Sequence, residues 1–287
     1  MSKTTATVKP VLTFDTMISS TAVPRWSPAW FICGGIRAYN AARRALLPAP
    51  HAAVANSEEL REIQQLAGVP TDIDEHLELM YAEALLLRPA VIVKLGVRGG
   101  TSTFVFERAA RACGSHVISV DIEDCSAISS YSRWHFYQGD DVQFAAQFGE
   151  FCCERNIPPQ LDLPFIDTSH QYEHTVQEIR AWFPLLSSRA KVMFHDTNLN
   201  LFGPRRDGCF AVSFDNQRAV VRAIEDCLAV SIQEHRQYVE YAGGWLVRHW
   251  PNCNGFTILD RVALESQAPT ADGLPGHSQP ANALIER

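Results

Sequence analysis

Acidic and histidine side chains follow two of the apolar, strand-like runs of this sequence. Asp167 and His170 come after one run, and His195 and Asp196 come at the end of the next. Because neighbouring parallel strands end at one edge of a sheet, these four side chains are expected to converge there. Carboxylate ligands favour Mg²⁺ as the bound ion, and an imidazole ligand also allows Mn²⁺. We therefore predict a divalent cation that clamps two substrate oxygens and lowers the pKa of a bound hydroxyl.

His170 is the candidate general base, because the unperturbed pKa of histidine suits proton removal near neutral pH. For each histidine of the cluster, a hydrogen bond that merely orders a loop is the alternative. For His174, which falls in the following helical segment, the sequence favours that structural role.

A glycine-dense turn separates another apolar run from a helical segment. Residues 91–103 read VIVKLGVRGGTST, with glycines at 96, 99 and 100. Glycine lets the backbone approach a ligand closely, and the helix start offers free N–H groups to a carboxylate or phosphate. The spacing is GxxGG rather than the GxGxxG of dinucleotide-binding proteins, so a nicotinamide cofactor is disfavoured.

Two further acids follow strand-like runs near this turn. Asp121 ends the second run, where an acid of a doubly wound sheet typically accepts hydrogen bonds from ribose hydroxyls. Asp140 follows the third run and could reach an adenine amino group. The alternative for Asp140 is that it caps the next helix.

The elements that carry these residues alternate along the chain. The pattern predicts a Rossmann-like, doubly wound α/β fold with a seven-stranded, mostly parallel sheet and an antiparallel strand pair at its end. Pro164 is unexpected in a central strand, because proline lacks the N–H donor. The predicted strands are residues 90–95, 116–121, 134–138, 161–167, 190–195, 244–249 and 255–261, and the predicted helices are 72–88, 102–113, 141–155, 172–186 and 216–228.

The ends of the chain differ from this regular centre. Residues 1–71 are interrupted by prolines, which predicts an N-terminal extension rather than part of the main domain. A helix is predicted over 30–47. It is either a docking helix, a lid over the substrate or a dimer arm. Residues 72–262 form the predicted main domain, and the polar segment 263–287 a flexible tail. Residues 197–218 lack a clear element and suggest a substrate-gating loop.

The amino-acid composition limits the classes of binding partner that this protein is expected to have. The 287 residues carry 25 basic and 32 acidic side chains, a net charge of −7, which gives no electrostatic footprint for nucleic acid or an anionic membrane. The eight cysteines form no CxxC pair, and the N-terminus lacks the apolar core of a secretory signal. We expect a cytoplasmic protein that acts on a small molecule, with a homodimer compatible with the N-terminal extension.

The order and spacing of the motifs resemble those of class I S-adenosylmethionine-dependent methyltransferases. The motifs are residues 91–103, Asp121, residues 139–140, FIDTSH at 165–170 with Tyr172, and FHDT at 194–197. The group concerned includes macrolide sugar O-methyltransferases and the so-called cephalosporin hydroxylases. The resemblance implies metal-assisted O-methylation of a hydroxylated secondary metabolite or sugar. It implies metal ligands at Asp167, His195 and Asp196. It also implies S-adenosylmethionine contacts at Gly96, Val97, Arg98, Gly99, Gly100, Ser102, Asp121, Ile122, Asp140 and Asp167.

Lys94 departs from this group, whose members usually carry an acid there to hold the methionine ammonium of the cofactor. A lysine reverses the charge, and Lys94→Glu is expected to tighten cofactor binding. Three functions stay open: a metal-assisted O-methyltransferase, a cofactor-binding protein with impaired catalysis, and, disfavoured by the glycine spacing, an oxidoreductase.

Overall fold

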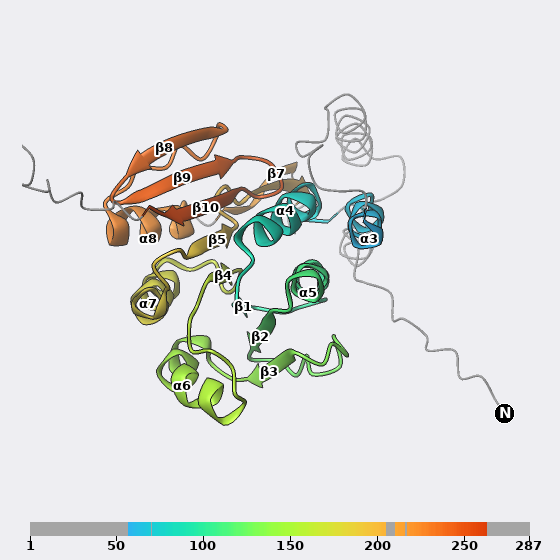
Figure 1. Cartoon of the computed structure of the whole chain (residues 1–287). Helices are drawn as coiled ribbons and strands as arrows, with labels where there is room; N and C mark the ends of the chain where they lie inside the picture. Colours follow the sequence, from blue (N-terminus) through green and yellow to red (C-terminus); the bar gives the residue numbers. More distant parts are fainter. Residues whose placement is uncertain (1–56, 70, 205–209, 216, 263–287) are drawn as a thin grey trace, which may run out of the picture.

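The computed structural model describes residues 57–69, 71–204, 210–215 and 217–262, and within them an α/β fold (Figure 1). The strands are β1 (Val91–Leu95), β2 (His116–Asp121), β3 (Trp134–Gln138), β4 (Leu163–Ile166), β5 (Lys191–His195), β6 (Asn200–Pro204), β7 (Phe210–Asp215), β8 (Tyr238–Ala242), β9 (Trp245–Trp250) and β10 (Phe256–Arg261). The α-helices are α3 (Glu58–Ala67), α4 (Leu77–Leu87), α5 (Thr101–Cys113), α6 (Asp141–Glu154), α7 (Tyr172–Trp182) and α8 (Ala219–Leu228). Short 3₁₀ turns, Asp74–His76 and Phe183–Leu185, precede α4 and follow α7.

The central sheet has the strand order β3-β2-β1-β4-β5-β10-β9-β8. The first five strands pair in parallel, and β10, β9 and β8 are antiparallel. The chain leaves β1 toward β2 on one side and later returns to β4 on the other, so β1 and β4 flank the point where the strand order reverses. In open α/β sheets, ligands bind at the carboxyl ends of the strands at this point.

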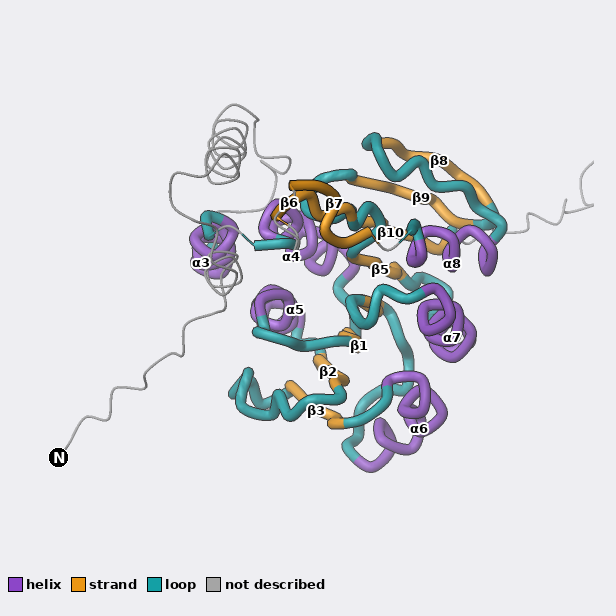
Figure 2. Tube along the Cα trace, turned by 180° about the vertical axis from the view of Figure 1, so that it is seen from behind, coloured by secondary structure: helices purple, strands orange, loops and turns teal. Residues whose placement is uncertain are grey.

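Helices cover both faces of the sheet, with α3, α4 and α5 on one side and α6, α7 and α8 on the other (Figures 1 and 2). Alternate residues of β1 face the two sides. Val91, Val93 and Leu95 belong to the apolar core that contains α6, α7 and α8, and Ile92 belongs to the core under α4 and α5. This double burial explains the nearly continuous apolar sequence of the parallel strands.

The fold class is confirmed, with two differences in detail. An eighth strand, β8, extends the antiparallel end of the sheet; its central residues are exposed, so the sequence carries no apolar run there. Residues 200–204 and 210–215, predicted as part of a loop, pair as the antiparallel strands β6 and β7. The predicted helix at 30–47 and the tail at 263–287 lie outside the described residues.

Pro164 is accommodated at the beginning of β4. It pairs in register with Val93 of β1, but the ladder to β5 starts one residue later, at Phe165 opposite Met193. The Lys191 N–H donates to the Asp162 carbonyl at 2.8 Å, so β5 already runs beside β4 at this point. The missing N–H of proline therefore leaves the ladder to begin only at Phe165.

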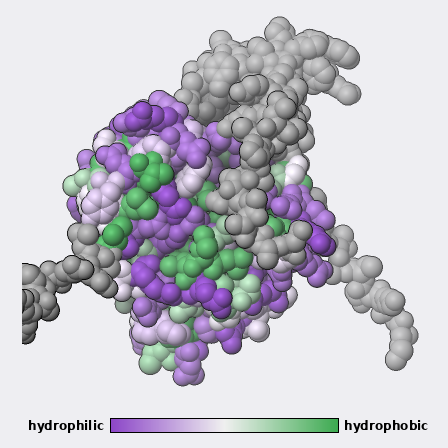
Figure 3. All heavy atoms as spheres, turned by 45° about the horizontal axis from the view of Figure 1, so that its top comes forward, coloured by the Kyte–Doolittle hydropathy of each residue, from purple (hydrophilic) through white to green (hydrophobic). Residues whose placement is uncertain are grey.

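The surface mixes polar and apolar side chains. On the face shown in Figure 3, hydrophobic residues gather in a few patches between hydrophilic ones. Within the described ranges, no helix has the length and apolar character needed to cross a membrane.

A buried ion network holds α4 on the antiparallel end of the sheet. Glu83 of α4 accepts two hydrogen bonds from the Arg248 guanidinium, at 2.6 and 2.9 Å, and one from Lys191. Asp260 pairs with both cations. Burial alone would raise the pKa of Glu83, but hydrogen bonds from Arg248 and Lys191 lower it to about 2. The network thus joins α4 to β5, β9 and β10 through two acids and two bases.

We expect Glu83→Ala to lower the free energy of unfolding by about 3–5 kcal/mol, because it leaves two buried cations with Asp260 alone. Urea denaturation followed by circular dichroism measures this. Glu240→Ala, on the exposed edge strand β8, is the matched control and should change stability by less than about 0.5 kcal/mol. A similar small change for Glu83→Ala would contradict the role given to the network.

Candidate active site

The turn after β1 is pressed against the chain that follows β4. Gly96 has a φ of +80°, and a Cβ at this position would lie 2.1 Å from the carbonyl oxygen of Asp167. The Asp167 N–H in turn donates to the Leu95 carbonyl at 3.1 Å. Only glycine fits both the left-handed backbone and this approach. The predicted cofactor turn and the predicted acid cluster are therefore in direct backbone contact.

Helix α5 begins at this turn without a capping side chain. Its N-cap is Gly100, with a φ of +85°, and a Cβ there would lie 2.5 Å from the Ile128 side chain. Ser102 is buried within the first helical turn. An uncapped helix start presents N–H groups and the positive end of the helix dipole, which suits an anionic ligand group.

Asp121 lies at the end of β2 and holds the turn. Its Oδ2 accepts from the Val97 N–H at 2.6 Å and the Arg98 N–H at 3.2 Å, and its Oδ1 accepts from the Glu123 N–H at 3.0 Å. A carboxylate offers about four acceptor positions, so capacity remains for a ligand hydroxyl. The neighbouring Ile122 side chain is 75% exposed, an apolar surface beside the acid.

Asp140 has the capping role that the sequence left open. It is the N-cap of α6, and its Oδ1 accepts from the Gln143 N–H at 2.8 Å.

Lys94 is buried, with 1% of its surface exposed, and its Nζ donates to the Gly96 carbonyl inside the turn. Burial lowers the pKa of Lys94 to about 8, while Asp167 and Asp121 act in the opposite direction. The ammonium thus balances two acids of the site. A glutamate here would place a third carboxylate among them and face a carbonyl oxygen, so the structure argues against the expected benefit of Lys94→Glu.

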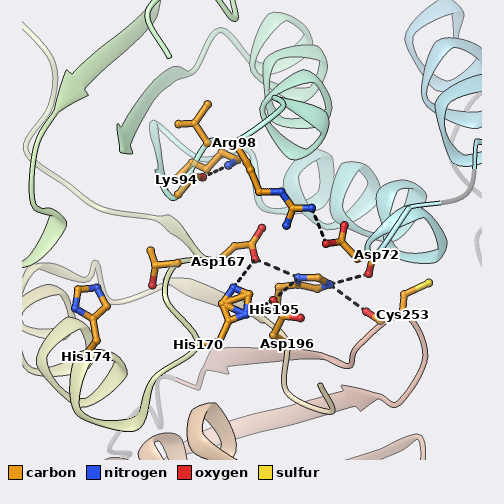
Figure 4. A network of polar contacts seen from close by, with 12 residues as sticks. Asp72, Lys94, Arg98, Asp167, His170, His174, His195, Asp196 and Cys253 are labelled. Carbon is orange, nitrogen blue, oxygen red and sulfur yellow. Dashed lines mark hydrogen bonds and ion pairs between the residues drawn. The ribbon is translucent and has the colours of Figure 1, made fainter. Parts of the chain in front are cut away.

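His195, at the end of β5, is buried with protein oxygens at both ring nitrogens (Figure 4). Nε2 lies 3.0 Å from the carbonyls of both Asp72 and Cys253, and Nδ1 lies 3.1 Å from carboxylate oxygens of Asp167 and Asp196. Carbonyls only accept, so Nε2 carries a proton, and Nδ1 donates to the carboxylates. Although burial would lower the pKa of His195, Asp196 and Asp167 raise it well above the ordinary value. The residue is an imidazolium.

His170 lies beside the same two acids as His195. His170 Nδ1 lies 2.7 Å from Asp196 Oδ2, and its Nε2 lies 4.0 Å from Asp167 Oδ1. The nitrogen and oxygen atoms of Asp167, His170 and Asp196 come close enough to hold one cation. Both nitrogens of His195 lie beside protein oxygens, and its ring orders the two carboxylates. The metal-ligand role of Asp167, His195 and Asp196 stays a prediction.

Two residues of this cluster have strained backbones. His170 and Asp196 have φ values of +56° and +57°, in the left-handed region that costs a non-glycine residue about 1 kcal/mol or more. Such strain persists where surrounding contacts over-determine it, and it concentrates at functional sites. Burial would raise the pKa of Asp196, but His195 and His170 hold it well below its usual range.

No sequence pattern pointed to Asp72 and Cys253 as residues of the site. Their backbone carbonyls hold His195, and the Asp72 side chain pairs with Arg98 of the glycine turn at 2.9 Å. Figure 4 shows Arg98 reaching over Asp167 toward Asp72. Backbone acceptors far away in sequence leave no residue-type signal, so local patterns could not find them.

Residues 93–197 match a family model described as a methyltransferase domain. The matched segment comprises 105 of the 287 residues. It contains the glycine turn, Asp121 and the acid and histidine cluster, and it confirms the resemblance predicted from the motifs. No curated protein matches the sequence.

Solved structures similar to the chain include other methyltransferases. One is the MycE methyltransferase of the mycinamycin biosynthetic pathway in complex with Mg, SAH and mycinamycin VI (16% identity, TM-score 0.46, 75% of this chain). This chain spans 58% of that protein's length. Others are a putative caffeoyl-CoA O-methyltransferase from Staphylococcus aureus (17% identity, TM-score 0.47, 72% of this chain and 93% of that one) and CalS11, a TDP-rhamnose 3'-O-methyltransferase of calicheamicin biosynthesis (15%, 0.40, 76% and 97%).

Buried Lys94 makes the free energy of unfolding depend on pH. Its pKa is about 8 in the folded state against 10.5 for the ordinary lysine, so the cost of burying the charge is fully present below about pH 8 and is gone above about pH 10.5. Relative to Lys94→Met, the wild-type free energy of unfolding should rise by about 3 kcal/mol across that window. Urea denaturation of both proteins at several pH values measures the difference; a constant difference would mean that Lys94 is not charged and buried.

Proposed function

We propose that the protein is an S-adenosylmethionine-dependent methyltransferase that methylates a hydroxyl group of a small secondary metabolite or sugar, assisted by a divalent cation. The observation that carries the proposal is the contact of Gly96 with the Asp167 backbone, which puts the cofactor turn and the acid cluster side by side. A methyl donor in the turn and an acceptor at the cluster would then be neighbours. The acceptor class follows from the resemblance of the motifs.

The residues of the turn fit the proposed cofactor. When bound, S-adenosylmethionine supplies a methyl group already activated on a sulfonium sulfur, so the protein has to provide placement and a deprotonated oxygen. The uncapped start of α5 would bind the carboxylate of its methionine part. Asp121 would accept from the ribose hydroxyls, and the exposed Ile122 side chain would lie against the adenine ring.

The cluster fits a cation and a general base. Asp167 and Asp196 would hold the cation, which lowers the pKa of a bound hydroxyl. His170 donates its Nδ1 proton to Asp196 at 2.7 Å, which orients the ring and leaves Nε2 as the atom that takes the proton from the acceptor. The imidazolium of His195 would keep both carboxylates in place throughout.

A second candidate function is cofactor binding without efficient catalysis. Lys94 supports it, because no carboxylate stands at this position to hold the methionine ammonium and the Lys94 ammonium is directed at the turn itself. The two functions share the same cofactor and differ in turnover.

Calorimetry tests the shared cofactor. We expect S-adenosylmethionine and S-adenosylhomocysteine to bind with measurable heat and NAD to show none, because the turn lacks the dinucleotide glycine spacing. Gly96→Ala should abolish binding of both sulfur ligands, since its Cβ collides with the Asp167 carbonyl; Gly149→Ala, in a helix with open space around it, is the control. Binding of NAD alone would overturn both candidate functions.

Turnover separates the two candidates and tests the cation. The formation of S-adenosylhomocysteine is measured against a panel of hydroxylated metabolites, with Mg²⁺ or Mn²⁺ and with EDTA. We expect turnover to stop with EDTA and with Asp196→Asn, while cofactor affinity changes little; Asp124→Asn, an exposed loop acid, should behave as wild type. Turnover that EDTA leaves unchanged would exclude the cation, and binding without turnover on any acceptor would favour the second candidate.

A further inference from the structure

A second group of ionisable side chains lies between α6 and α7, apart from the cluster at the sheet edge. Asp141 is the first residue of α6, and His174 and Glu178 lie one turn apart on α7. His174 Nε2 lies 3.1 Å from Asp141 Oδ1 and 3.7 Å from Glu178 Oε1. In Figure 4 His174 stands well away from His170, Asp167 and His195. The proposed methyl transfer uses none of these three residues.

The group places two buried carboxyl groups around one imidazole. Glu178 is completely buried and Asp141 is 7% exposed, and among the described residues no lysine or arginine pairs with either. Asp141 Oδ2 and Glu178 Oε2 are both buried without a hydrogen-bond partner there. Buried carboxylates are normally paired, hydrogen-bonded or bound to a metal. Here one partly exposed imidazole faces two such acids, and burial together with the neighbouring Asp141 raises the pKa of Glu178 well above its ordinary value.

The distances suit a bound cation. Around a tetrahedral zinc ion with ligand bonds of about 2.0–2.1 Å, neighbouring ligand atoms are about 3.3 Å apart, and the values here bracket that figure. The three ligand atoms can all lie around one ion. The i, i+4 spacing of His174 and Glu178 puts both on one face of α7, where α6 supplies the third atom.

We propose that Asp141, His174 and Glu178 bind a divalent transition-metal cation, with Zn²⁺ the best match, through His174 Nε2 and one oxygen from each acid. The imidazole nitrogen favours such cations, whereas two carboxylate oxygens alone would also suit Ca²⁺ and Mg²⁺. The His174 side chain is 26% exposed, so water completes the coordination from that side.

The site has a structural use. Thr168 Oγ1 donates to Glu178 Oε1 at 2.7 Å, and Thr168 directly follows Asp167. A cation that fixes Glu178 therefore also fixes the loop that presents Asp167 and His170. Binding at this site requires only folded protein, so it can hold whether or not the proposed methyl transfer is correct.

Zinc content tests the proposal in untagged full-length protein. The double variant Asp167→Asn/Asp196→Asn removes the acids of the other cluster and serves as the background. After dialysis against EDTA and then Zn²⁺ buffer, metal analysis should find a zinc ion in the background protein. Adding His174→Gln should remove it or weaken its binding by at least about 10-fold. Adding Glu173→Gln, an exposed acid on the same helix, should not.

Nitrogen NMR of ¹⁵N-histidine-labelled wild-type protein gives a second readout that needs no variant for its main result. Zn²⁺ should shift the His174 Nε2 resonance at a stoichiometric amount of metal. Zinc content that is the same with and without His174→Gln would overturn the proposal, as would a His174 resonance that Zn²⁺ does not move. In either case the three residues only join α6 to α7 by side-chain contacts, without a bound cation. If the background variant does not fold by circular dichroism, the NMR result on wild type decides.

Discussion

The site depends on the approach of two backbones at the reversal point of the sheet. Gly96 leaves β1 in a left-handed conformation with no room for a Cβ against the Asp167 carbonyl, and Asp167 returns a hydrogen bond to Leu95. Without this contact, the turn that is proposed to hold a cofactor and the loop that carries Asp167 would be separate surfaces. Because the contact is between main-chain atoms, it fixes both loops without relying on any flexible side chain.

Charge balance explains why charged side chains are buried at this site, although each of them would be unfavourable alone. Two buried cations compensate the acids of the site. Lys94 interacts with Asp167 and Asp121, and the imidazolium of His195 interacts with Asp196 and Asp167. Lys94, unusual at its position, compensates acids that the fold brings together. Buried charges are tolerated only when they are paired and hydrogen-bonded, and each of the two cations donates to protein oxygens.

Sequence patterns predicted the features that neighbouring residues determine, and missed the contacts between residues that are distant in sequence. The parallel strands, the glycine turn and the acids at strand ends could be predicted because burial on both faces and glycine chemistry mark neighbouring residues. The edge strand β8 could not, because its exposed centre has no apolar run. The contacts of His195 Nε2 could not be predicted either, because the carbonyls of Asp72 and Cys253 are distant in sequence and carry no residue-type signature.

The same limit applies to His174, which the sequence favoured as a structural residue. A histidine and a glutamate four residues apart are common on a helix surface. They become unusual only when α6 docks with Asp141 at its start and buries two carboxylates around one imidazole. Thr168 then joins this group to the strained loop of His170. A backbone held in the left-handed region needs support from its surroundings, and the buried group beneath α7 provides support from the side opposite to His195.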